Sequence, residues 1–290
     1  MAADTGFIGL GAMGVHMARN LHRHKLLTAV WNRTAGKAIE LANELGVHAS
    51  PNLDDLAARS RTVVMCVAAD ADVLSVVDAI APYLPADAVV IDCSTISADS
   101  AREAARRLAV RNVRFIDAPV SGGIEGARKG SLAIMVGGDV ETATRATPIL
   151  EAMGSTIAHF GDVGAGQAAK ATNQIMCAGI IQAISEAMAF AKAEGLPLDT
   201  LIDTLGKGAG SSWYFVNRAP NILRGEYPAG FRVQLHQKDL QICRTMAARH
   251  GVQLPLVEMT LLHYRRLIEQ GHGDEDISTL YRLKEALFAS

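Results

Sequence analysis

A glycine-rich turn near the amino end combines residue types and a spacing that suit phosphate binding. The stretch from Gly9 to Gly14 reads GLGAMG, so glycine occupies its first, third and sixth positions. It follows an apolar run and opens a helical pattern, which is the context that makes this spacing specific. Free N–H groups and the positive dipole end at a helix start favour an anion. We interpret the turn as a site for a dinucleotide pyrophosphate, formed by Gly9, Leu10, Gly11, Ala12, Met13 and Gly14.

The residues after the second predicted strand indicate which dinucleotide binds. Proteins that bind NAD usually carry Asp or Glu there, about 20 residues after the glycines, to hold the ribose hydroxyl. This chain has Asn32, Arg33 and Thr34 instead, and the next acid along the chain is Glu40. A guanidinium binds a 2′-phosphate through two hydrogen bonds, and the neighbouring amide and hydroxyl add donors. We therefore expect NADP(H) to be preferred over NAD(H); the alternative is that Arg33 is a solvated surface charge.

A lysine lies at the start of a long apolar helical pattern. The pattern runs from Gln167 to Ala193, and Lys170 falls in its first turns. Burying a lysine on such a helix is unfavourable unless it has a partner or a function, and burial favours loss of its proton. These properties suit a general acid that protonates an alkoxide and stabilises the developing oxyanion. Asn173 and Gln174 follow on the same helix face and are further catalytic candidates. The alternative is a surface lysine near a helix start.

A second glycine-containing loop follows the predicted strand that ends at Ala118. The loop, Asp117–Gly123, lies where the carboxyl ends of parallel strands form the ligand-binding edge of an α/β sheet. Ser121 supplies a hydroxyl, and Gly122 and Gly123 expose backbone N–H groups, which together form a nest for an anion. We predict that the loop binds the carboxylate of a small substrate; the alternative is a plain glycine turn.

Four stretches of the chain resemble the β-hydroxyacid dehydrogenase family, which includes 3-hydroxyisobutyrate dehydrogenases, tartronate semialdehyde reductases and glyoxylate/succinic semialdehyde reductases. They are Gly6–Gly14, Asp117–Gly123, Gly164–Asn173 and Lys238–Leu240, in the family's order and spacing over almost the whole chain. The resemblance implies that Lys170 is the proton donor and that the second loop binds the acid group of the substrate. It also implies interconversion of a small aldehyde or keto acid with its hydroxy acid, the reductive direction being favoured with NADPH.

The resemblance assigns roles to further residues. In similar enzymes the lysine at the position of Lys238 reaches the cofactor across the domain cleft, and the acid at Asp239 lies near the catalytic site. Phe231 resembles an aromatic residue on the substrate side. Val67 and Thr95, after two predicted strands, border the nicotinamide ribose in the family. From the residues alone, Lys238 and Asp239 are equally well an ordinary exposed pair.

The sequence does not decide whether Asn173 or Gln174 supplies the amide that assists Lys170. The family pattern usually has asparagine four residues after the lysine, whereas this chain has Gln174 there and Asn173 beside it. That pair and the stretch 231–240 resemble the tartronate semialdehyde reductases. The stretch 32–34 instead resembles the glyoxylate/succinic semialdehyde reductases, so no single substrate is chosen.

Three other identities are weighed against this one. An imine reductase shares the architecture but usually has another residue at the position of Lys170, which counts against it. A catalytically silent NADPH-binding scaffold keeps the glycine turn and loses the proton donor, so Lys170 together with Ser121 counts against it. A 6-phosphogluconate dehydrogenase needs a much longer helical domain than this chain provides.

The first part of the chain must position these groups on a parallel sheet. Short continuous apolar runs alternate with helical patterns, as expected when helices cover both faces of a sheet. This alternation predicts a doubly wound α/β Rossmann domain that binds NADP over residues 1–162. The strand candidates are Thr5–Gly9, Thr28–Trp31, Thr62–Val67, Ala88–Cys93, Val113–Ala118 and Leu132–Gly137. The helix candidates are Ala12–Arg23, Thr34–Leu45, Ala71–Ile80 and Ser97–Ala109.

Beyond Gly161 the pattern is helical throughout. The helix Gln167–Ala193 ends at a Gly-Leu-Pro stop signal, and no strand candidate follows. We expect an all-helical substrate and oligomerisation domain over residues 163–290, with the long helix between the domains. So apolar a helix needs more cover than one small domain gives, which predicts a homo-oligomer, either a dimer or a tetramer. The later helix candidates are Asp199–Leu205, Ser212–Leu223, Val233–His250, Leu254–Gln270 and Ile277–Leu287.

Composition and charge limit the partners, the cellular location and the metal content that we expect. The 290 residues carry a net charge of −2, so neither a nucleic acid nor an anionic membrane is an expected partner. No uninterrupted apolar run reaches the roughly 18 residues of a membrane span, and the first residues lack the features of a signal peptide. The four cysteines are far apart in the sequence, which favours reduced thiols in the cytoplasm. The histidines form no clustered set, so we expect no metal.

Overall fold

The computed structural model describes residues 4–288. By its internal contacts the chain divides into two compact units, Met1–Lys170 and Ala171–Ser290. The division falls inside helix α8 (Ala165–Ala193), whereas the boundary expected from the sequence lies between residues 162 and 163, just before that helix. Lys170 is therefore the last residue of the first unit, and the two amide residues that follow it belong to the second.

The Met1–Lys170 unit is built on a sheet of nine strands among the described residues. They are β1 (Thr5–Ile8), β2 (Leu27–Trp31), β3 (His48–Ala49), β4 (Thr62–Met65), β5 (Val89–Asp92), β6 (Arg114–Asp117), β7 (Val120–Ser121), β8 (Leu132–Gly137) and β9 (Gly154–Gly161). Their order is β3-β2-β1-β4-β5-β6-β8-β7, with β9 paired to β8. The first six strands of this order are parallel, and β8 is antiparallel to β6 and β7. The Rossmann sheet predicted from the sequence is confirmed.

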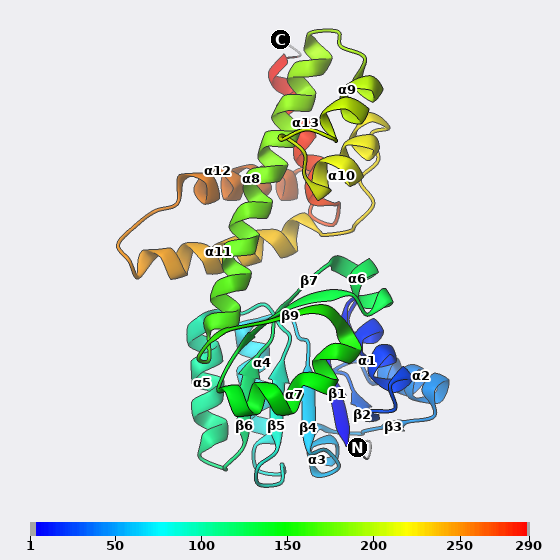
Figure 1. Ribbon diagram of the computed structural model, residues 1–290, viewed down its shortest axis with the longest axis vertical. Helices are drawn as coiled ribbons and strands as arrows, with labels where there is room; N and C mark the ends of the chain where they lie inside the picture. The colour runs from blue at the N-terminus through cyan, green and yellow to red at the C-terminus, as the bar shows by residue number, and fades with distance from the viewer. Residues whose placement is uncertain (1–3, 289–290) are drawn as a thin grey trace. The chain divides into compact units, whose positions relative to one another are not determined.

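Two layers of helices cover this sheet (Figure 1). One contains α1 (Gly14–Arg23), α2 (Ala35–Leu45), α6 (Gly123–Lys129) and α7 (Val140–Met153); the other contains α3 (Leu53–Ala58), α4 (Asp70–Ile80) and α5 (Ala98–Ala109). Successive side chains of a strand enter opposite layers, so Phe7 packs with α1 and α2 while Ile8 packs with α3 and α4. Burial on both faces explains why the strands are continuously apolar.

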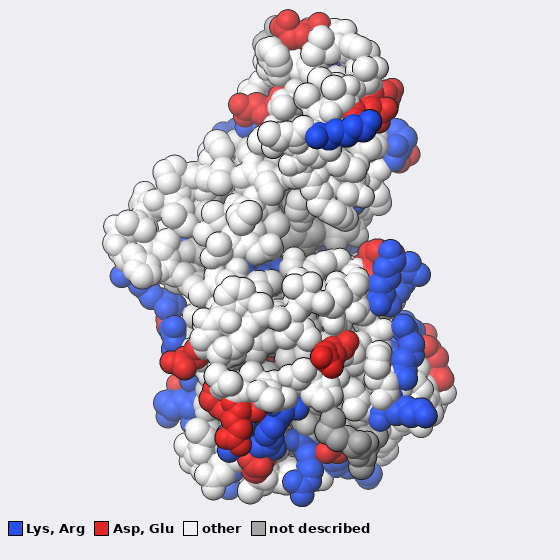
Figure 2. All heavy atoms as spheres, in the orientation of Figure 1, with Lys and Arg blue, Asp and Glu red and all other residues white. Residues whose placement is uncertain are grey.

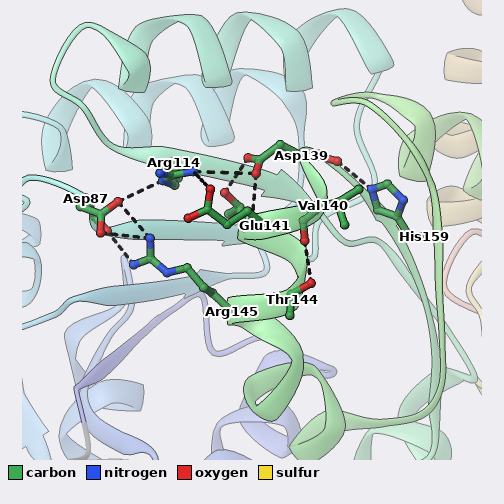
Figure 3. A network of polar contacts seen from close by, with 10 residues as sticks. Asp87, Arg114, Asp139, Val140, Glu141, Thr144, Arg145 and His159 are labelled. Atoms are coloured by element: carbon green, nitrogen blue, oxygen red, sulfur yellow. Dashed lines mark hydrogen bonds and ion pairs between the residues drawn. The ribbon is translucent and has the colours of Figure 1, made fainter.

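A network of ion pairs joins α7 to the sheet (Figure 3). Asp87, in the turn before β5, accepts hydrogen bonds from Arg145 at 2.9 Å and from Arg114 at 3.0 Å. Arg114 also pairs with Glu141 of α7 at 3.4 Å. The guanidinium groups of Arg145 and Arg114 hold the pKa of Asp87 below its ordinary value. The network lies at the amino ends of β5 and β6, opposite the edge where parallel strands bind ligands, so it supports the fold rather than the site.

The Ala171–Ser290 unit is helical throughout its described part, and its extended pairing there is limited to one isolated bridge between Arg232 and Asp276. After α8 come α9 (Leu198–Leu205), α10 (Trp213–Leu223), α11 (Val233–Ala248), α12 (Pro255–Glu269) and α13 (Tyr281–Glu285), with 3₁₀ turns at Ile277–Leu280 and Ala286–Phe288. Ile181 of α8 packs with α11 and α12, whereas Met188 packs with α9 and α10. The all-helical second part of the predicted fold is confirmed.

Helix α8 is long and apolar enough, by length and composition alone, to cross a membrane. Within residues 4–288 it is the single helix with this property. It is not an uninterrupted apolar run, because polar residues such as Lys170 and Gln174 lie within it. Of its most apolar window, 56% is buried inside the protein. The contacts of α8 are therefore those of a core helix.

Several large apolar side chains of the helical unit are exposed. Met176 and Phe190 on α8, and Met259 and Leu262 on α12, are each more than a third exposed. Figure 2 shows few charged side chains on the surface over α11 and α12. Exposed apolar surface of this kind suits contact with another protein chain. The homo-oligomer expected from the sequence stays a prediction.

Candidate active site

The predicted phosphate turn lies between β1 and α1, at the carboxyl edge of the parallel strands. Gly9 has a φ of 95°, and a side chain there would lie 2.3 Å from the carbonyl oxygen of Cys66. A methyl group at Gly14 would lie 1.9 Å from the carbonyl oxygen of Gly9, so glycine allows α1 to approach β1 closely. A methyl group at Gly11 meets no atom within 4 Å. The turn therefore has the open backbone that a pyrophosphate requires.

Asn32 makes a structural contact that the sequence did not predict. Its Oδ1 accepts a hydrogen bond from the Leu10 N–H at 2.9 Å, and its Nδ2 donates to the carbonyl oxygen of Thr34 at 3.1 Å. The side chain thus joins the end of β2 to the phosphate turn. Asn32 organises this turn, and its contact with a 2′-phosphate stays a prediction.

Arg33 is an exposed side chain beside the start of α4. Its Nη1 lies 3.3 Å from Oδ1 of Asp72, and 85% of the arginine side chain is exposed. An ion pair this exposed contributes little to stability. The guanidinium can therefore leave Asp72 and bind a more strongly charged anion instead. Thr34 is the first capping residue of α2, and its carbonyl oxygen accepts a hydrogen bond from the Lys37 N–H at 3.1 Å.

Val67 and Thr95 follow the neighbouring strands β4 and β5. The Val67 N–H donates to Oγ of Ser94 at 2.9 Å, which links the two loops. The Ser94 N–H in turn donates to Oδ1 of Asp92 at 2.9 Å. The two residues that the resemblance places near the nicotinamide ribose therefore lie on one hydrogen-bonded edge of the Met1–Lys170 unit.

Asp117, the first residue of the second loop, is buried and holds the start of α8. Its Oδ1 accepts a hydrogen bond from the Gly164 N–H at 2.7 Å, and its Oδ2 accepts one from the Gln167 N–H at 2.8 Å. Both oxygens satisfy backbone donors that the first turn of a helix leaves without a partner in the helix itself. Asp117 therefore positions α8, a role that sequence analysis did not assign.

Ser121, Gly122 and Gly123 form the rest of this loop, just beyond the carboxyl end of β6. Ser121 lies on β7 opposite Ala133 of β8 and is half-buried. Gly122 and Gly123 are exposed and have φ angles of 134° and 63°. The loop thus combines a hydroxyl with two exposed glycine N–H groups, and binding of a substrate carboxylate there stays a prediction.

Lys170 is buried in the second turn of α8, with 7% of its surface exposed. This burial excludes the alternative of a solvated surface lysine. Gln167, three residues earlier and on the same helix face, is 1% exposed and hydrogen-bonds to the loop after β5. The structure therefore places Lys170 next to the edge that carries the predicted nucleotide-binding residues, all within one compact unit.

One chain of polar contacts in the Ala171–Ser290 unit connects four of the predicted site residues: Asn173, Gln174, Asp239 and Lys238. Nε2 of Gln174 donates to Oδ2 of Asp239 at 2.6 Å, and Nζ of Lys238 lies 3.1 Å from Oδ1 of Asp239. Nδ2 of Asn173 donates to Oε1 of Gln174 at 2.8 Å. A carboxylate only accepts hydrogen bonds, so Asp239 fixes which end of the Gln174 amide faces it. Asp239 is 5% exposed, which excludes an ordinary exposed pair with Lys238.

Phe231 is held in place by a residue that sequence analysis missed. Its N–H donates to Oδ2 of the fully buried Asp276 at 2.9 Å, across a sequence separation of 45 residues. Asp276 also pairs with Arg218 at 3.2 Å. The Phe231 ring lies 5.0 Å from the ring of His236. The substrate-side role of Phe231 stays a prediction.

Two buried carboxyl groups, Asp92 and Asp117, lie side by side at the ends of β5 and β6. Burial raises the pKa of Asp92 to about 7, opposed by hydrogen bonds from Ser94 and reinforced by the charge of Asp117. Burial also raises the pKa of Asp117, although hydrogen bonds from Gly164 and Gln167 oppose it. Oδ2 of Asp92 has no hydrogen-bond partner among the described residues. Both residues end an apolar run with the sequence Ile-Asp. This repeated pattern could have predicted two acids at the carboxyl ends of neighbouring strands.

Metal-binding groups do not gather in the part of the chain that the structure describes. Within residues 4–288, no three His, Cys, Asp or Glu side chains come close enough to hold a metal ion. The absence of a metal from the working protein stays a prediction. Cys66, Cys93, Cys177 and Cys243 are free thiols, and all but Cys66 are buried.

Comparison with known proteins matches both parts of the chain to family models. Residues 4–161 match the model described as the NAD binding domain of 6-phosphogluconate dehydrogenase. Residues 164–284 match the model described as NAD-binding of NADP-dependent 3-hydroxyisobutyrate dehydrogenase. With the Rossmann sheet and its glycine turn, these matches define an oxidoreductase that binds a pyridine nucleotide.

Individual relatives narrow this class. The NAD-dependent L-serine dehydrogenase of Pseudomonas aeruginosa is 33% identical over 290 residues, and the match covers 97% of each chain. The 3-hydroxyisobutyrate dehydrogenase of the same organism is 30% identical and covers 97% of this chain and 98% of that one. The solved structure of Mycobacterium tuberculosis 3-hydroxyisobutyrate dehydrogenase with L-serine has a TM-score of 0.90 at 30% identity, covering 98% of this chain and 99% of that one. The chain belongs to the β-hydroxyacid dehydrogenase family, as its motifs indicated.

We predict that Asp92→Asn changes the pH dependence of stability. The pKa of Asp92 in the folded protein is about 7, above the ordinary value of an aspartate. Between about pH 4 and pH 7 the folded protein therefore keeps a proton that the unfolded chain releases, so the free energy of unfolding falls as pH rises through this window. Because asparagine does not ionise, the variant should gain Tm relative to wild type between about pH 5 and pH 8, by roughly 2 °C or more.

Thermal unfolding of both proteins at several pH values measures this gain. The matched control is Asp99→Asn on α5, where the replaced carboxyl group is 62% exposed. The control should show no gain in Tm as pH rises. A Tm difference between Asp92→Asn and wild type that stays constant over the whole range would contradict the raised pKa.

Proposed function

We propose that this protein reduces a small aldehyde or keto acid to its hydroxy acid with NADPH, and that Lys170 is the general acid. The observation that carries the proposal is the burial of Lys170 in α8, one turn after the residues that Asp117 anchors to the edge of the Rossmann sheet. That edge is where an open α/β sheet binds its ligand, so an ammonium group there is suited to proton transfer. Membership of the β-hydroxyacid dehydrogenase family supports the reaction class.

The residues of the chain manage the proton and the charge. When bound, the nicotinamide supplies the hydride. Nζ of Lys170 stabilises the negative charge that develops on the carbonyl oxygen and then donates its proton to that oxygen. In the opposite direction the neutral amine accepts the proton from the hydroxyl group. A buried position keeps water from competing for this proton.

We assign the assisting amide to Gln174. It lies four residues after Lys170, and 1% of it is exposed. Asp239 fixes the orientation of its amide, whereas Asn173 directs its own amide at Gln174. Asn173 therefore supports Gln174, and Gln174 orients the reacting oxygen.

The substrate class follows from the second loop. The hydroxyl of Ser121 and the N–H groups of Gly122 and Gly123 suit a carboxylate. The relatives named for L-serine and 3-hydroxyisobutyrate act, by their names, on short hydroxy acids. We therefore propose a carboxylate whose carbonyl carbon lies one to three carbons from the carboxylate carbon, as in glyoxylate and the tartronate and succinic semialdehydes.

The preference for NADP(H) rests on Arg33. No carboxylate ends β2, and Arg33 extends into solvent beside the phosphate turn. A pocket of about 280 Å³ next to this turn is lined by Gly11 and Ala12 and by two cations and two acids, so it adds no net charge to the argument from Arg33; the four charged residues are Arg19, Lys37, Glu40 and Glu44. The comparisons do not decide between the two cofactors. One relative is named as NAD-dependent, whereas the description of one matching family model names an NADP-dependent enzyme.

Steady-state assays test the proposal as a whole. The substrates are glyoxylate, succinic semialdehyde and tartronate semialdehyde, with 3-hydroxyisobutyrate and L-serine in the oxidative direction, each with both nucleotides. We expect turnover of at least one acid, with a higher kcat/KM for the NADP form. Tight NADPH binding without turnover of any of the five acids favours the silent scaffold and overturns the proposal.

We predict that Lys170→Ala lowers kcat by about 100-fold or more and changes the Kd of NADPH by less than about threefold. The amine acts on the substrate oxygen in the transition state, so its loss affects the rate more than nucleotide binding. Lys192→Ala is the matched control, because it makes the same change on the same helix at an exposed side chain paired with Glu285. Activity of Lys170→Ala equal to that of the control shows that the proton donor is another group.

We predict that Arg33→Ala raises the KM for NADPH by about tenfold or more and leaves the KM for NADH within about twofold. The charge-assisted hydrogen bonds to the 2′-phosphate are lost, and NADH has no such phosphate. Asp72→Asn is the control that removes the ion pair with Arg33 while keeping the guanidinium. Its KM for NADPH should not rise. Equal increases for both nucleotides in Arg33→Ala show that the arginine does not recognise the 2′-phosphate.

A further inference from the structure

One side chain connects the helix turn that carries Lys170 with the loop that carries Thr95. Gln167 is 1% exposed. Its Nε2 donates to the carbonyl oxygen of Ser94 at 2.8 Å, and its Oε1 accepts from the Ile96 N–H at 3.2 Å. The amide therefore binds the backbone on both sides of Thr95, as a neighbouring strand does.

The same helix turn is also fixed through its backbone. The Gln167 N–H donates to Asp117 at 2.8 Å. A methyl group at Gly166 would lie 2.3 Å from the carbonyl oxygen of Met135, so the helix lies directly against β8. Lys170 follows Gln167 by three residues and shares its helix face. A displacement of Gln167 is therefore passed to Lys170 through a single helical turn.

We propose that Gln167 is a positioning residue that holds Lys170 and the Ser94–Ile96 loop at a fixed separation. The inference rests on the proposed function, in which Lys170 donates the proton. Proton donation needs heavy atoms about 3 Å apart, and a misplacement of about 1 Å can lower a rate about 100-fold. Gln167 acts through Lys170 and the loop rather than on the substrate.

A merely structural glutamine is available for comparison on the same helix. Gln182 is 4% exposed, and its Nε2 donates to Oγ1 of Thr260 at 3.2 Å and to Nδ1 of His263 at 3.0 Å. Gln182 is thus about as buried as Gln167, but only its Nε2 is hydrogen-bonded, because its Oε1 has no partner among the described residues. Gln182 lies in the Ala171–Ser290 unit and contacts none of the proposed site residues through these bonds. Loss of either amide removes two hydrogen bonds; in Gln182 one of these is only part-buried and an unpaired oxygen is lost as well, which offsets part of the loss of stability.

We predict that Gln167→Met slows hydride transfer, whereas Gln182→Met does not. Both changes keep the side-chain volume close to the original and remove the amide. Single-turnover loss of NADPH absorbance is followed with the carbonyl acid of highest kcat/KM among glyoxylate, succinic semialdehyde and tartronate semialdehyde, and the Kd of NADPH is measured by fluorescence. Gln167→Met should lower the rate by about tenfold or more and change the Kd by less than about threefold. Gln182→Met, which also removes a buried amide from α8, should keep the rate within about twofold.

A double-mutant cycle separates positioning from general destabilisation. In the Lys170→Ala background, Gln167→Met should slow hydride transfer by less than about twofold, because a residue that acts through the amine has no effect once the amine is absent. Equal slowing in both backgrounds overturns the proposal, as does a wild-type rate for Gln167→Met. If the methionine variant does not fold, Gln167→Asn, which is one methylene shorter and still polar, is held to the same pattern. Wild-type activity of Lys170→Ala instead overturns the proposed function, so the two failures are distinguishable.

Discussion

The carboxylate of Asp117 determines where helix α8 begins. It ends β6 and accepts hydrogen bonds from two N–H groups at the helix start, so the sheet edge and the helix share one buried acceptor. Burying a carboxylate costs free energy, and its raised pKa shows that the two hydrogen bonds offset this cost only in part. The positions of Gln167 and Lys170 follow from this contact. With the start of α8 fixed, Gln167 meets the loop after β5 and Lys170 comes next on the same face.

Most of the fold could be predicted because its strands are buried on both faces. Continuous apolar runs gave β1, β2, β4, β5, β6 and β8 to within two residues at each end. Elements without that pattern were missed. Helix α7 contains Pro148 and several threonines, which disfavour a helix in isolation, and β9 is largely exposed at the edge of the sheet. Both are held by packing against β8, the strand that precedes them, and such tertiary contacts leave no apolar pattern of their own in the sequence.

In the site, too, residues identified by a local sequence pattern differ from residues identified only by contacts with parts of the chain far away in the sequence. The glycine turn, Arg33 and Lys170 could be predicted as site residues because short spacings and residue types single them out. The connecting residues were missed because each acts over a long separation: Gln167 is 73 residues from Ser94, and Gln174 is 65 residues from Asp239. For the same reason the sequence left open which amide assists Lys170. Only the contact with Asp239 distinguishes Gln174 from its neighbour.

The two buried acids at the sheet edge, Asp92 and Asp117, differ in how well their ionised forms are stabilised. Asp117 receives hydrogen bonds from two backbone N–H groups, which favour its ionised form, whereas one oxygen of Asp92 has no partner among the described residues. The charge of Asp117 further disfavours ionisation of Asp92, so below about pH 7 the proton resides on Asp92. Below about pH 7 Asp92 therefore adds no negative charge to the edge that is proposed to bind an anionic nucleotide. A neutral Asp92 keeps the Ser94 contact without adding repulsion toward phosphate or carboxylate groups.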